Sequence, residues 1–65
     1  MQKNTQFTIG LFKDGQLIDT IRSFSLPFND RTLMLVDGFT AWIADGLKDI
    51  TPDGHYVAFD YEGRK

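Results

Sequence analysis

The chain has no cysteine and a single histidine in 65 residues. Without cysteine it can form neither a disulfide nor a thiolate metal site. A metal centre would have to rest on His55 and carboxylates alone. We therefore expect no metal and no cofactor. The absence of disulfides also favours a cytoplasmic location.

Long apolar runs and phosphate-binding glycine patterns are missing as well. No stretch of about eighteen apolar residues occurs, and no basic segment precedes a shorter apolar one, so we expect neither a membrane span nor a secretion signal. The six glycines follow neither the dinucleotide-binding nor the P-loop spacing. The sequence thus predicts a soluble protein without a nucleotide site.

Charge is low and evenly spread. Seven basic and nine acidic residues give a net charge of −2, and the basic residues form no cluster before Arg64 and Lys65. Proteins that bind nucleic acid usually carry a basic stripe or patch. This distribution argues against a nucleic-acid partner.

The residues that might carry chemistry lack suitable neighbours in the sequence. His55 follows a Pro-Asp-Gly turn, and no motif activates a hydroxyl group for it to deprotonate. Asp37, Asp45 and Asp49 fall on successive turns of a predicted helix, where a straight helix would splay them apart. We interpret His55 as a residue at the start of a strand and the aspartates as a solvated face. We therefore predict that the protein is not an enzyme.

Two strands joined by a tight turn are predicted in the first half of the chain. Phe7, Ile9 and Leu11 alternate with polar or small residues, and a second strand runs from about Gln16 to Phe24. The Asp14-Gly15 pair between them is a strong hairpin signal.

The length of this turn decides which side chains share a face of the sheet. A two-residue turn would place Leu11 opposite Ile18. A three-residue loop would place Leu11 opposite Leu17 and Phe7 opposite Ile21, which gathers the apolar side chains on one face. We favour the three-residue loop for this reason.

A helix is predicted from about Asp30 to Lys48, with Asn29 or Asp30 as its N-cap. Its apolar side recurs at helical spacing and comprises Leu35, Val36, Phe39, Trp42, Ile43 and Leu47. Thr40 falls on the predicted polar side. The alternative is that Arg31 to Val36 form a third strand and that Asp37 caps a shorter helix.

A turn and a last strand are predicted after the helix. Thr51-Pro52-Asp53-Gly54 is typical of a turn, and His55 to Tyr61 alternate again. We therefore predict one small α+β domain over residues 1–65, with frayed ends at 1–5 and 62–65. Its ββαβ order implies two layers: a three-stranded, mainly antiparallel sheet with the first strand in the centre, and one helix on one face.

Apolar side chains remain once this core is assigned, and they predict a protein-binding surface. The candidate binding residues are Phe12, Ile18, Phe24, Phe28, Met34 and Tyr56. Such a small core also favours association with a partner, because disulfides and metals are absent.

We therefore expect a non-enzymatic module that binds another protein, as an inhibitor or regulator of a larger macromolecule, and that self-associates as a homodimer. No motif identifies a family. In size, apolar surplus and lack of catalytic groups, the chain resembles small virus-encoded proteins that bind and inhibit host enzymes, which implies the host cytoplasm. The alternatives are a structural subunit of a larger assembly or a nucleic-acid-binding domain.

Overall fold

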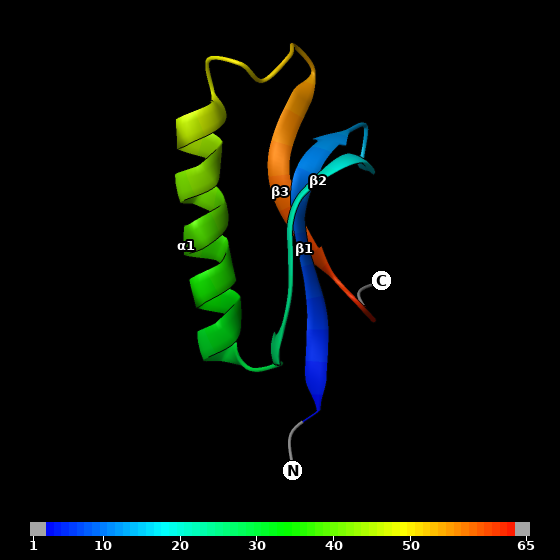
Figure 1. Cartoon of the computed structure of the whole chain (residues 1–65), viewed down its shortest axis with the longest axis vertical. Helices are drawn as coiled ribbons and strands as arrows, with labels where there is room; N and C mark the ends of the chain where they lie inside the picture. The colour runs from blue at the N-terminus through cyan, green and yellow to red at the C-terminus, as the bar shows by residue number, and fades with distance from the viewer. Residues whose placement is uncertain (1–2, 64–65) are drawn as a thin grey trace.

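The computed structural model describes residues 3–63, which form three strands and one helix. The elements are β1 (Asn4–Lys13), β2 (Gln16–Pro27), α1 (Asp30–Leu47) and β3 (His55–Tyr61). Figure 1 shows the helix as one layer and the strands as the other. The molecule is elongated, with extents of 42 × 21 × 15 Å.

The three strands form one open sheet in the order β2-β1-β3. The central strand β1 is antiparallel to both neighbours, so β2 and β3 run in the same direction. The predicted two-layer ββαβ fold with the first strand in the centre is therefore confirmed.

The predicted register of the β1–β2 hairpin is wrong. Lys13 pairs with Gln16 across a two-residue turn, in which Asp14 and Gly15 have φ angles of 54° and 79°. These positive values are those of the turn that best matches the twist of a hairpin. Neither pairing considered for Leu11 occurs, because β2 is irregular: Leu11 lies opposite Asp19.

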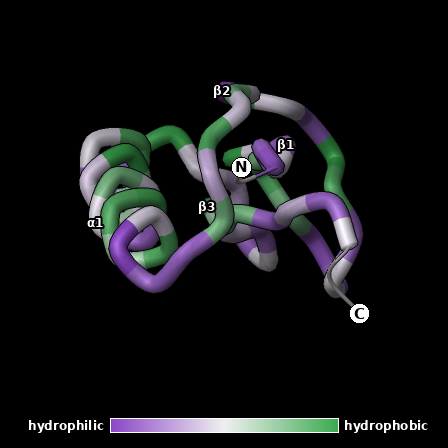
Figure 2. The backbone as a smooth tube through the Cα atoms, turned by 90° about the horizontal axis from the view of Figure 1, so that it is seen from below, coloured by the Kyte–Doolittle hydropathy of each residue, from purple (hydrophilic) through white to green (hydrophobic). Residues whose placement is uncertain are grey.

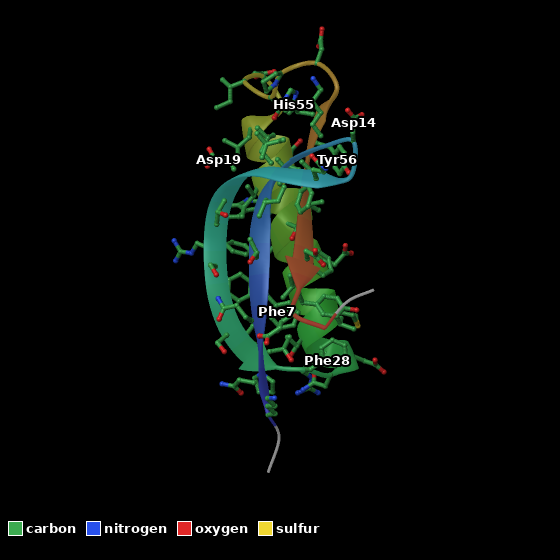
Figure 3. The ribbon with its side chains drawn as sticks, turned by 90° about the vertical axis from the view of Figure 1, so that its right-hand side faces the viewer. Phe7, Asp14, Asp19, Phe28, His55 and Tyr56 are labelled. Carbon is green, nitrogen blue, oxygen red and sulfur yellow. The ribbon has the colours of Figure 1, made fainter. Side chains whose placement is uncertain are left out.

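Two β-bulges in β2 account for this difference. The pairing steps from Leu17 to Asp19 and then from Thr20 to Arg22, which leaves Ile18 and Ile21 without partners on β1. Each bulge adds one residue to the strand and bends it. As a result, the start of β2 curls across the face of the sheet that points away from α1 (Figure 3).

The segment 31–36 is helical, so the alternative of a third strand there is excluded. Asn29 caps the helix, because its side-chain oxygen accepts a hydrogen bond from the backbone N–H of Thr32 at 2.9 Å. The helix ends at Leu47, one residue before the predicted end. The predicted turn at 51–54 is also present, and the His55 N–H donates to the carbonyl oxygen of Pro52 at 3.1 Å.

The core is small and lies between α1 and the β1–β3 side of the sheet. Phe7, Ile9 and Val36 are its fully buried side chains. The helix packs mainly against β3, and a groove separates it from the second half of β2. Figure 3 shows α1 behind β1 and β3, whereas the second half of β2 lies off to one side.

This placement corrects the predicted core. Leu17 and Ile21 of β2 are exposed. The bulges change the face of the sheet to which the side chains of β2 point, and α1 does not cover these two residues. On the helix, Thr32, Val36 and Thr40 are buried, and Leu33 and Ile43 also pack against the core. Burial of Thr40 on the predicted polar side is tolerated because its hydroxyl donates to the carbonyl oxygen of Val36 at 2.6 Å.

The predicted frayed ends are partly ordered. β1 already begins at Asn4, and the backbone N–H of Glu62 donates to the carbonyl oxygen of Gln6 at 3.0 Å. Asn4, Thr5 and Glu62 therefore extend the sheet instead of fraying. The rest of the two predicted ends includes residues 1–2 and 64–65, which lie outside the described residues.

Candidate functional site

The candidate catalytic groups make local hydrogen bonds with the backbone. His55 is half-buried, and its Nδ1 lies 3.1 Å from the carbonyl oxygen of Asp53. The hydroxyl of Ser23 donates to the carbonyl oxygen of Phe7 at 3.4 Å, and that of Thr51 donates to Leu47 at 2.7 Å. These contacts support the hairpin and the end of the helix.

The predicted acidic face does not converge on a point. Asp45 forms an exposed ion pair with Lys48 at 3.7 Å, and Asp49 lies beyond the end of α1. Within residues 3–63, no group of three or more His, Cys, Asp or Glu side chains is arranged to hold a metal ion. No helix in this part of the chain is long and apolar enough to cross a membrane.

The six predicted binding residues do not form one surface. Phe12 and Tyr56 pair across the β1–β3 ladder and stack on each other, and only 8% of Phe12 is exposed. Phe24 is half-buried and stacks on Phe7, with ring centroids 5.9 Å apart. Phe12 therefore contributes mainly to packing, whereas Phe24 packs on Phe7 and keeps part of its surface exposed.

The other predicted residues are exposed and come from different elements of the fold. Met34 projects from α1 with 76% of its surface exposed, and Ile18 is a bulged residue of β2. Figure 3 shows Phe28 and Tyr56 near opposite ends of the molecule. Phe28 also contacts Tyr61, with ring centroids 5.1 Å apart. Their predicted role in binding stays a prediction, but they offer no single continuous patch.

An exposed apolar feature of α1 is a row that the sequence assigned to the core. Leu35, Phe39 and Trp42 have 64%, 37% and 72% of their surfaces exposed. Their i, i+4, i+7 spacing puts them on one side of the helix. The Phe39 and Trp42 rings stack with centroids 5.8 Å apart. We call these three residues the α1 apolar row.

An open groove adjoins this row on the side of β2. It has a volume of about 440 Å³ and is lined by Arg22, Phe24, Leu26, Leu35, Val36 and Phe39. The groove exists because α1 packs over β3 and leaves β2 uncovered. Its lining is apolar except for the charge of Arg22. The α1 apolar row and this groove therefore form a continuous apolar surface between the two layers.

The exposed row results from an apolar arc on α1 that is wider than the surface it covers. Val36 faces the core, whereas Leu35 and Trp42 lie about a quarter turn away around the helix. Figure 2, viewed along the long axis, shows apolar residues on more than one side of the α1 coil. The width of this arc is the sequence signal that could have identified the surface.

Two glycines within α1 provide a second signal. A Cβ atom added at Gly38 or Gly46 would meet nothing within 4 Å, so no contact within residues 3–63 requires glycine there. Each glycine nevertheless weakens a helix by about 1 kcal/mol relative to alanine. Both are exposed and lie near Trp42 on the helix surface.

Comparison with protein-family models, curated proteins and solved structures finds no match for this chain. Its function is therefore argued from its own surface.

Proposed function

We propose that the chain is a non-enzymatic protein-binding module, which acts by docking on another protein as an inhibitor or regulator. The α1 apolar row and the adjoining groove are its binding surface. The observation that carries this proposal is the exposure of Leu35 and Trp42, at 64% and 72%, on a helix that also has a buried side.

The total surface supports a chain that needs a partner. A compact monomer of 7.4 kDa exposes about 4200 Å². This chain exposes 5043 Å², which is several hundred Å² more. Its fully buried large side chains are Phe7, Ile9 and Val36. A core of this size gives only about 3–5 kcal/mol of stability, so burial of additional apolar surface in a complex would contribute substantially.

The residue types of the row are those that dominate interface energetics. Tryptophan and other aromatic residues are enriched at the centres of interfaces, where truncation commonly costs 2 kcal/mol or more. Trp42 is the only tryptophan of the chain and is largely exposed. The stack with Phe39 holds its ring in place, which lowers the entropy lost on binding.

The test is a capture experiment with the immobilised chain and a lysate of its source cells. We expect Trp42→Ser and Leu35→Ser to lose the proteins that the wild type retains, while thermal melts show that both variants still fold. Ile50→Ser is the matched control, because Ile50 is equally exposed but lies beyond α1. Equal capture by the wild type and Trp42→Ser would contradict the proposal.

The small core favours a second candidate function, that of a structural subunit of a larger assembly. In that case the isolated chain would lose its structure on dilution, because the contacts of the assembly would supply most of its stability. Circular dichroism over a dilution series separates the two. A regulator module keeps its folded signal when it is dilute, whereas such a subunit does not.

A further inference from the structure

We propose that the α1 apolar row binds a second copy of this chain, with the two α1 helices antiparallel across a two-fold axis. This inference rests on the proposed function, because it names a partner for the same surface. Three features of α1 support it: the position of its glycines, the self-complementarity of the row and the charges at its two ends.

The glycines share a side of α1 with the row. At about 100° per residue, Gly38 and Gly46 lie within a sixth of a turn of Leu35, and Trp42 lies between them. Among the described residues, no atom lies within 4 Å of where a Cβ would be at either glycine. Each glycine therefore destabilises the helix, and no contact in this part of the monomer compensates for it. A missing Cβ lets another helix or a large side chain come close. The glycines thus leave room for a partner where the row is exposed.

An antiparallel pair centred between Gly38 and Phe39 makes the row complementary to itself. Leu35 of one copy then lies opposite Trp42 of the other, and the Phe39 ring lies over Gly38 of the other copy. Because a two-fold axis repeats every contact, each match occurs twice. Packed helices lie about 8–10 Å apart, a distance at which the ring of Phe39 needs the space that Gly38 leaves.

Charge selects the antiparallel orientation. Arg31 lies in the first turn of α1 and Asp45 in the last, and both are exposed near the edge of the row. An antiparallel pair places Arg31 of each copy near Asp45 of the other. A parallel pair would bring like charges together at both ends. The helix dipoles also favour the antiparallel arrangement.

The area of this contact predicts a weak, reversible dimer. The exposed parts of the three row residues amount to on the order of 400 Å² per copy, and the groove and Arg31 extend the contact. Stable interfaces bury about 800 Å² per partner, and smaller ones are typically transient. We therefore expect a dissociation constant in the micromolar range.

The experiment is sedimentation velocity of the purified chain from about 1 μM to about 1 mM, a range that brackets the affinity of a small interface. Trp42 reports independently, because its fluorescence emission shifts to shorter wavelength when the ring leaves water. We expect the sedimentation coefficient to rise from monomer to dimer and the emission to shift over the same range. Trp42→Ser should remain monomeric by sedimentation.

The Gly38→Ala variant separates association from folding. A Cβ at this position has open space in the monomer, so the variant should melt at a higher temperature than the wild type at low concentration. The same Cβ would displace Phe39 of the second copy, and we expect dimerisation to weaken about tenfold or more. Ile50→Gln is the matched control, because Ile50 is 76% exposed but lies beyond the end of α1. It should leave dimerisation unchanged.

Charge exchange tests the orientation. Arg31→Glu and Asp45→Lys should each weaken the dimer, and the double variant should restore it. A chain that stays monomeric to about 1 mM would overturn this inference. If capture of another protein still required Trp42, the proposed function would survive that result. A dimer that Ile50→Gln disrupts and Gly38→Ala does not, or a double variant without rescue, would also overturn it.

Discussion

The ring of Phe12 stacks on the ring of Tyr56, with centroids 5.8 Å apart and planes inclined by 16°, on neighbouring strands of the sheet. Phe12 is thereby almost completely buried, although it lies outside the cluster of Phe7, Ile9 and Val36. The hairpin end of the sheet therefore has a small packing centre of its own.

Phe12→Ala should cost about 3–4 kcal/mol, because it removes a buried ring and leaves a cavity. That loss is comparable to the whole stability expected of a chain of this size, so we expect an extensively unfolded variant. Phe12→Leu, which keeps most of the volume, should remain folded. Urea unfolding followed by circular dichroism checks both. A cooperative Phe12→Ala variant of near wild-type stability would show that the stack contributes little.

Gly10→Ala should destabilise the hairpin by about 1–3 kcal/mol. An added Cβ would collide with the side chain of Leu17 and with the backbone carbonyl of Asp19. The Leu17 side chain can turn away, but the carbonyl belongs to the paired strand and cannot.

The Gly10→Ala/Leu17→Ala double variant separates these two contacts. Thermal melts should show that removal of the leucine side chain does not rescue the loss. Full recovery in the double variant would mean that Leu17, and not the Asp19 backbone, limits the space at Gly10.

Asn29→Ala should lower the free energy of unfolding by about 1 kcal/mol, since the N–H of Thr32 loses its acceptor. Asn29→Asp should be close to neutral, because a carboxylate accepts the same hydrogen bond and suits the positive end of the helix dipole. Chemical denaturation measures the difference. Equal stability of the alanine and asparagine forms would argue that water replaces the cap.

Substitutions at the two positions of the Asp14-Gly15 turn should have opposite effects on stability. Gly15→Ala should destabilise by about 1–2 kcal/mol, since the φ angle of 79° is unfavourable for a residue with a Cβ. Asp14→Gly should be neutral or slightly stabilising, since Asp14 also has a positive φ of 54°. Urea midpoints of the two variants check the order. A tolerated Gly15→Ala would indicate that the turn changes type at little cost.

The order and type of the elements followed from local patterns in the sequence. Three of these patterns extend over only a few residues: the alternation in β1 and β3, the Asp14-Gly15 pair and the Asn29 cap. They can therefore be recognised without knowledge of the fold. The sheet order followed from the handedness and topology of connections. These signals gave the correct fold class.

The register and the buried side of α1 were wrong for a different reason. A bulge at Ile18 or Ile21 cannot be recognised from the alternation of apolar and polar residues, because the bulge depends on how two strands pair. The buried side of α1 depends on where the helix lies over the sheet. Thr40 is buried and Trp42 exposed because α1 sits over β3, which hydropathy alone does not specify.

The proposed binding surface differs from the predicted one because the core differs. The candidates were the apolar residues left over once the core was assigned, so a different core changes the candidates. Phe12 is packed in the sheet, whereas Phe24 stacks on Phe7 and also lines the groove. Leu35 and Trp42, which were assigned to the core, are exposed. The excess of apolar residues could be predicted from composition. Which of them are exposed could be determined only from the way α1 packs on the sheet.

The two bulges of β2 also affect how readily the edge of the sheet can pair with other molecules at high concentration. An outer strand of twelve residues with isoleucines along it would, if straight, be a template on which other molecules stack into fibrils. The kinks at Ile18 and Ile21 break that strand into short, differently directed pieces, so incoming backbone can match only a few amides at a time. We therefore expect the bulges to lower the tendency of β2 to add strands from other molecules, although Ile18 and Ile21 are exposed to water.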